Sequence, residues 1–104
     1  MLRRLMFCLM LVSSAGLSAQ EAPLVEIYMP SPCLACIDWG SYLTDKGFRV
    51  SYKETADMAA VKRRLKVPKD MESVHTALVG GYFVEGHAYA EDIHELLRDK
   101  PKAR

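Results

Sequence analysis

Hydrophobic and polar residues follow two different periods along this chain, and the changes of period predict its elements. Residues 24–29 are mostly apolar and rich in strand-forming residues, and Pro30 ends the run. Residues 48–53 alternate apolar and polar side chains, the period of a half-buried strand. Between these two strands, residues recur at the spacing of one helix face, at Cys36, Trp39, Gly40 and Leu43. We therefore expect strand, helix and strand in succession, with Gly47 just past the end of the helix.

A second helix is predicted after Asp57, because aspartate is a favoured residue at the position that caps a helix N-terminus. Its apolar face comprises Met58, Val61 and Leu65. The basic residues of the same segment are predicted to form a solvated face on the other side, made of Lys62, Arg63 and Arg64. Pro68 closes this helix, and residues 69–74 are expected to form a connecting loop.

A pair of glycines separates two apolar segments in the last third of the chain. Residues 77–79 and 82–85 have strand character, and Gly80-Gly81 between them tolerates the positive φ angles of a tight turn. These features predict a β-hairpin. A last helix follows, with Ile93 on its inward face and Pro101 beyond its end.

The predicted order of elements is β-α-β-α-β-β-α. Two strands joined through a helix form a parallel crossover, whereas the last two strands form an antiparallel hairpin. A four-stranded mixed sheet flanked by helices is the thioredoxin-like arrangement of the α/β class. We therefore expect one thioredoxin-like domain.

The first nineteen residues show a separate pattern. They begin with basic residues at positions 3–4, continue through an apolar stretch at 5–12 and end in small residues up to Ala19, as secretory signal peptides do. The apolar stretch is far shorter than the roughly 20 residues that span a bilayer. We expect residues 1–19 to be a signal peptide, residues 20–104 to be the exported domain, and no stable membrane anchor.

Charge narrows the range of partners. The full chain has 14 Lys and Arg against 13 Asp and Glu, a net charge of +1, and removal of residues 1–19 takes away only two basic residues, leaving −1. A nearly neutral chain without a basic run argues against nucleic acid as a partner.

Cys33 and Cys36 form a Cys-x-x-Cys motif between the first strand and the first helix. In an oxidising compartment such a pair is a structural disulfide, a catalytic pair or a metal site. Cys33 is predicted at the helix N-terminus, where free backbone N–H groups and the helix dipole favour thiolate. Thiolate is both the nucleophile of disulfide exchange and a ligand for soft metals. A disulfide closing so small a loop adds only roughly 2 kcal/mol of stability, which favours a functional pair.

Five segments of this chain occur together in one known family. They are residues 30–39 with the Cys-x-x-Cys motif, 57–62 (Asp-Met-Ala-Ala-Val-Lys), Val67-Pro68, 73–77 (Ser-Val-His-Thr-Ala) and 81–93. Together they resemble the exported family called domain of unknown function 411, whose better-studied members are periplasmic copper-resistance proteins. The resemblance covers about residues 24–99.

The resemblance implies a thioredoxin-like fold and copper binding through cysteines of the first loop, helped by nearby sulfur and imidazole groups. We accordingly expect a periplasmic protein that captures Cu(I) through Cys33 and Cys36, with a role in copper tolerance or handling. Met29, His75 and His87 are further candidate ligands, since thioether and imidazole groups bind copper. Each also has a simpler interpretation, as a core methionine, a packed histidine and a loop histidine.

Two departures from the family reduce the number of thiols. Members usually carry Cys-Gly-Cys-Cys where this chain has Cys33-Leu34-Ala35-Cys36, and Ser-Cys-His-Thr where this chain has Val74 before His75. We therefore expect one soft ion rather than a cluster of several copper ions.

Two other functions use the same residues. A thiol–disulfide oxidoreductase would use Cys33 and Cys36 as its catalytic pair, although redox members of the fold place a cis-proline where this chain has His75. Zinc would suit Cys33, Cys36, His75 and His87 if all four converged. We expect metal binding rather than enzymatic activity, with a metal ion and another periplasmic copper-handling or redox protein as partners.

Overall fold

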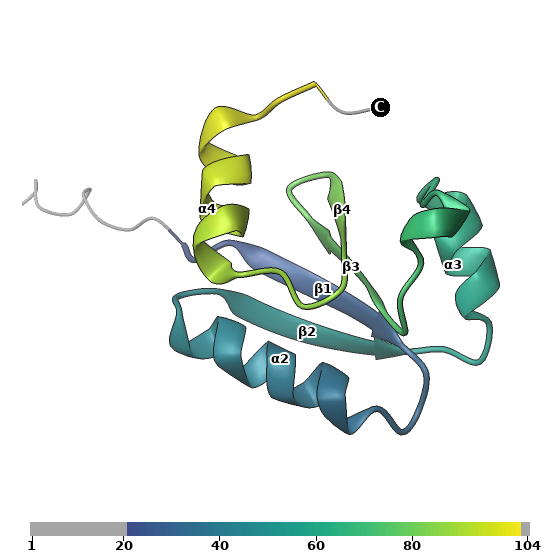
Figure 1. Cartoon of the computed structure of the whole chain (residues 1–104). Helices are drawn as coiled ribbons and strands as arrows, with labels where there is room; N and C mark the ends of the chain where they lie inside the picture. Colours follow the sequence, from purple (N-terminus) through teal and green to yellow (C-terminus); the bar gives the residue numbers. More distant parts are fainter. Residues whose placement is uncertain (1–20, 103–104) are drawn as a thin grey trace, which may run out of the picture.

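The structure is a computed structural model that describes residues 21–102 (Figure 1). The predicted signal peptide, residues 1–19, lies outside the described residues. Within residues 21–102, no helix is long and apolar enough to cross a membrane.

The first half of the domain is a parallel crossover. Strand β1 (Leu24–Met29) leads into helix α2 (Leu34–Asp45), which returns the chain to strand β2 (Arg49–Glu54). The two strands pair in parallel along their whole length, from Leu24 opposite Arg49 to Met29 opposite Glu54. Phe48, predicted as the first residue of the second strand, lies just before β2 and is buried.

The second half adds a helix and a hairpin. Helix α3 (Met58–Arg64) is followed by a short 3-10 helix, η2 (Lys69–Met71), inside the predicted loop. Strands β3 (Thr76–Val79) and β4 (Tyr82–Glu85) then pair antiparallel around Gly80 and Gly81, both of which have positive φ. Helix α4 (Ala90–Asp99) ends the described fold.

The four strands form one mixed sheet in the order β2-β1-β3-β4. This order makes β1 and β3 the central strands (Figure 1). Strand β1 is parallel to β2 and antiparallel to β3. The order of elements and the topology confirm the prediction of a thioredoxin-like α/β domain.

One face of the sheet carries the main core. Alternate residues of β1 are buried, and they pack with residues of α2 and α4; the cluster includes Val25, Ile27, Met29, Cys36, Trp39, Leu43 and Ile93. The cysteine motif thus lies at the start of the helix that packs on strands β1 and β2. Because Cys36 is part of this cluster, core packing fixes the position of its sulfur.

Two side chains of α2 bind the connection that leads into α4. The indole N–H of Trp39 donates to the carbonyl of Ala88 at 3.0 Å, and the hydroxyl of Tyr42 accepts the backbone N–H of Ala90 at 2.8 Å. The second bond satisfies a free donor at the start of α4. These bonds fix residues 88–90 relative to the helix that carries the cysteines.

Lys62 corrects the predicted solvated face of α3. Its side chain is buried, and its ammonium group forms an ion pair with Glu85 at 2.9 Å. The prediction was wrong because helical periodicity does not show which part of the face will lie on the sheet. Arg63 and Arg64, its neighbours in the same basic run, are exposed as predicted.

Candidate functional site

Cys33 lies at the N-terminus of α2, where the sequence places it. It is the capping residue of the helix, and its sulfur accepts the backbone N–H of Cys36 at 3.2 Å. This N–H is one of the donors that a helix leaves unsatisfied at its first turn. Hydrogen bonding and the helix dipole favour negative charge on this sulfur once it is a free thiol.

In this structure Cys33 and Cys36 form a disulfide, with an S–S distance of 2.00 Å. The two sulfurs differ in access, because Cys33 is half-buried and Cys36 is fully buried. A disulfide cannot supply two thiolate ligands, so metal binding by the pair requires its reduction. The structure therefore describes the oxidised state of the motif.

His75 faces the buried sulfur. Its ring atom Nδ1 lies 3.7 Å from Sγ of Cys36, and its Nε2 lies 3.0 Å from the carbonyl oxygen of Gly86. Because a carbonyl oxygen can only accept, Nε2 carries the hydrogen of this bond. In the neutral ring Nδ1 is then unprotonated, and its lone pair is directed toward Cys36.

Burial keeps the ring of His75 neutral. The side chain is fully buried, and desolvation lowers the pKa of His75. The hydrogen bond to Gly86 acts in the opposite direction, and the proximity of His87 lowers the pKa further. A neutral imidazole at pH 7 is the form that binds metals or accepts a proton.

Three aromatic rings stack at the side of the disulfide. The ring of His75 lies 4.8 Å from that of Trp39 and 5.3 Å from that of His87, with interplanar angles of 26° and 11°. The centroids of Trp39 and His87 are themselves 6.0 Å apart, so the three rings form a triangular cluster. His87 is exposed, so it forms the solvent-facing member of this cluster. The sequence analysis did not predict that Trp39 contacts the site. It predicted only that Trp39 packs in the core as part of the apolar face of its helix.

Of the other candidate ligands, Met29 is 2% exposed and belongs to the same buried cluster as Cys36. Within residues 21–102, no three His, Cys, Asp or Glu side chains already form a metal-binding group. The structure brings together the two sulfurs and the unprotonated Nδ1 of His75. Sulfur and imidazole nitrogen fit the donor preference of copper, so the residues present suit the ion that the sequence predicts.

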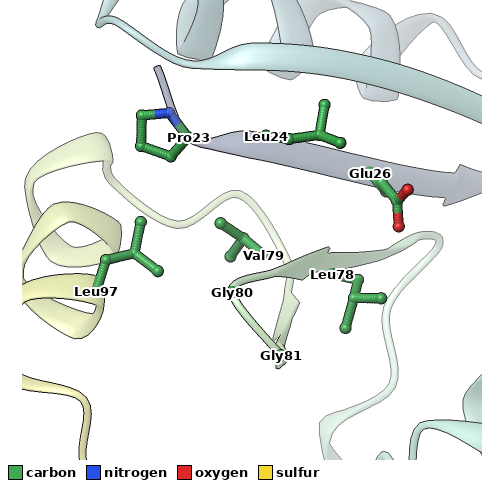
Figure 2. A pocket seen from close by; sticks show the side chains of 8 residues that line it. All are labelled: Pro23, Leu24, Glu26, Leu78, Val79, Gly80, Gly81 and Leu97. Atoms are coloured by element: carbon green, nitrogen blue, oxygen red, sulfur yellow. The ribbon is translucent and has the colours of Figure 1, made fainter. Parts of the chain in front are cut away.

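A cavity of about 350 Å³ lies elsewhere in the fold (Figure 2). Its walls come from the start of β1, the β3–β4 turn and α4, and Leu97 contributes the side chain from α4. Since β1 advances about 3.3 Å per residue from Leu24 to Met29, the cavity lies at the opposite end of the strand from Cys33. It is therefore separate from the cysteine site.

Comparison with known proteins finds similar sequences and structures. The family model "Protein of unknown function, DUF411" matches residues 71–104. A structure named copper resistance protein copG, form 2, is 43% identical with a TM-score of 0.72, and the match covers 74% of this chain and 62% of that one. Form 1 is 42% identical with a TM-score of 0.71, over 75% of this chain and 62% of that one.

The chain thus spans less than two thirds of the length of these two structures. A more remote match, with a TM-score of 0.47 and 24% identity over 69% of this chain, is named thioredoxin-like protein BC3987. No curated protein matches the sequence. The family model and the two copper-resistance structures confirm the resemblance to the DUF411 family that the sequence indicates.

Proposed function

We propose that this protein captures one Cu(I) ion through the reduced sulfurs of Cys33 and Cys36, with Nδ1 of His75 as a third ligand. The observation that carries the proposal is the 3.7 Å approach of Nδ1 to Sγ of Cys36, with Nε2 already bound to Gly86. The hydrogen bond to a backbone carbonyl fixes the ring of a metal-binding histidine and leaves the other nitrogen free.

The chemistry of the donors favours Cu(I) over a harder ion. Thiolates are soft ligands that select Cu(I), and imidazole also binds copper. The N–H of Cys36, which donates to Sγ of Cys33, and the dipole of α2 stabilise negative charge on Cys33, so the thiolate forms more readily there. The buried position of Cys36 and His75 limits access of water to that side of the site.

The oxidation state of the pair controls whether copper can bind. Reduction of the Cys33–Cys36 disulfide takes up two electrons and two protons and gives two thiols, and each thiol loses its proton when it binds the ion. The oxidised protein lacks both thiolates. A periplasmic thiol reductant or a reduced partner protein would supply the electrons.

The relatives support a copper-related role, because the two structures at 43% and 42% identity are named copper resistance proteins. We infer that the chain acts in copper tolerance or handling after export to the periplasm. Its partners would be the copper ion and a periplasmic copper-handling or redox protein.

Anaerobic titration with Cu(I) against a chromophoric chelator tests the proposal. The reduced protein should bind about one ion per chain, whereas the oxidised protein and the Cys33→Ser variant should bind none with comparable affinity. The variant Ser31→Ala, which changes an exposed residue of the same loop, is the control and should behave as the unaltered protein. Binding that is weak and independent of cysteine would contradict the proposal.

A second function, thiol–disulfide exchange, is favoured by a different observation. The disulfide has an accessible sulfur at a helix N-terminus and a buried sulfur beside His75, whose Nδ1 is placed to accept a proton from Cys36. An oxidoreductase would catalyse insulin reduction or the refolding of a reduced substrate. Turnover lost in Cys33→Ser would support this function, and its absence in fully reduced protein would exclude it.

A further inference from the structure

A buried ion pair lies next to the backbone of His75, and neither proposed function uses it. Lys62 of α3 and Glu85 of β4 form an ion pair at 2.9 Å, with side chains that are 7% and 4% exposed. A buried ion pair is weak evidence for stability, because desolvation offsets much of the attraction. We therefore ask which residues this ion pair holds in place.

Lys62 binds the segment that carries His75. Its ammonium group donates to Glu85, to the hydroxyl of Thr76 at 2.7 Å and to the backbone carbonyl of His75 at 3.3 Å. An ammonium group has three donors, and each of them has a partner here. The cation thus contacts the residue whose ring faces Cys36, through that residue's own backbone.

Glu85 also binds the segment that carries His75, residues 73–76. Its carboxylate accepts the backbone N–H of Ser73 at 2.8 Å and a hydrogen bond from Thr76, which lies directly opposite on β3. Burial alone would raise the pKa of Glu85, but the bonds from Thr76, Lys62 and Ser73 outweigh it and lower that pKa. The carboxylate is therefore charged at neutral pH.

Ser73 extends this network to the residue that fixes the imidazole. Its hydroxyl accepts the backbone N–H of Gly86 at 3.0 Å, and it can donate to the carbonyl of His75 at 2.8 Å. The carbonyl of the same Gly86 accepts Nε2–H of His75. Both the backbone and the ring of His75 are thus held by groups that converge on Lys62 and Glu85.

We propose that the buried pair Lys62–Glu85 is a positioning device that holds His75 with Nδ1 directed at Cys36. Neither residue touches the sulfurs in this arrangement; both act through residues 73–76 and Gly86. The part of the proposal that concerns copper affinity rests on the proposed function. The part that concerns the orientation and tautomer of His75 does not.

The test removes both charges together, in the double variant K62M/E85Q, so that no unpaired charge is left buried. Arg63→Met is the matched control, because Arg63 is the exposed neighbour of Lys62 on the same helix. In metal-free protein, imidazole ¹⁵N chemical shifts report which nitrogen of His75 carries the hydrogen. We expect a single Nε2–H form in the unaltered protein and in Arg63→Met, and a mixture of the two tautomers in K62M/E85Q.

Copper affinity supplies the second measurement. The double variant should bind Cu(I) about tenfold more weakly, and adding His75→Ala to it should cause little further loss, because the two changes remove the same contribution. Lys62→Arg, which keeps a cation at this position, should retain most of the affinity.

The outcomes separate this proposal from the proposed function. Folded K62M/E85Q with unchanged ¹⁵N shifts of His75 would overturn the positioning role, and so would losses of affinity that simply add to those of His75→Ala. If the unaltered protein bound no Cu(I) through its cysteines, the proposed function would fail, while the tautomer measurement would still decide whether the pair positions His75.

Discussion

The sulfur of Cys36 lies 3.7 Å from Nδ1 of His75, although the two residues are 39 positions apart in the chain. The first comes from α2 and the second from the residue before β3, and the core packing of α2 on the sheet brings them together. This contact adds a buried imidazole nitrogen to the two sulfurs of the motif.

His75 should titrate below the ordinary histidine value of 6.5, because burial lowers its pKa. The unfolded chain therefore binds this proton more readily than the folded protein. The contribution of His75 to stability is complete above pH 6.5 and is lost as the pH falls toward the pKa of the folded state. An NMR titration of the His75 ring protons measures this directly, and a midpoint at or above 6.5 would contradict it.

Replacement of His75 by alanine should weaken Cu(I) binding about tenfold, equivalent to about 1.4 kcal/mol, because one of three ligands is lost. The stoichiometry should remain one ion per chain, since both cysteines are retained. His94→Ala is the control: that histidine stacks on Phe48 and bonds the carbonyl of Lys46, away from the sulfurs. Chelator competition measures both, and an equal effect of the two substitutions would exclude His75 as a ligand.

Reduction of the Cys33–Cys36 disulfide should leave the domain folded. The closed loop spans a sequence separation of only 3, so the loss of stability is expected to be about 2 kcal/mol or less. Urea denaturation with and without reductant, followed by circular dichroism, measures the difference. Unfolding on reduction alone would show that the disulfide is mainly structural.

Acid should remove the stabilising contribution of Glu85. Its pKa is lowered in the folded protein, so this contribution is present above the pKa of the unfolded state and disappears as the pH falls through that of the folded state. The free energy of unfolding of the unaltered protein should therefore decrease in acid more than that of K62M/E85Q. Parallel curves between pH 7 and pH 3 would contradict the charge assigned to Glu85.

Gly40 should not tolerate a larger residue. A Cβ atom there would lie 2.7 Å from Cε1 of Tyr52, whose hydroxyl donates to the carbonyl of Ile37. Gly40→Ala should destabilise the domain by about 1–3 kcal/mol, the usual cost of overpacking. In a Tyr52→Ala background the same substitution should cost clearly less, and denaturation midpoints of the four proteins measure the difference.

Local patterns were enough to predict the elements of the fold. The strand at residues 24–29 has the predicted bounds, and the hairpin turns at Gly80 and Gly81 as expected. Asp57 caps α3, with its carboxylate accepting the N–H of Ala60 at 3.0 Å. Each of these features depends on residues close together in the sequence, which is why the sequence alone reveals them.

The side-chain arrangement of the site could be predicted only in part. Cys33 at a helix N-terminus follows from the order of strand and helix, and the closeness of His75 follows from the fold. The stack of His75 on Trp39 depends on how α2 packs on the sheet, and the bond to Gly86 requires the exact path of the 86–89 connection; no local pattern encodes either. Lys62 was misplaced for a related reason, since its burial depends on partners in β3 and β4.

The stack beside the disulfide also gives the protein an intrinsic fluorescent reporter. Trp39 is the single tryptophan of the sequence, it is 5% exposed, and its ring lies 4.8 Å from that of His75. Tryptophan emission from the unlabelled protein therefore originates at one location, next to His75. Quenching or a spectral shift on oxidation, reduction or addition of metal can be assigned to this location without the introduction of a dye.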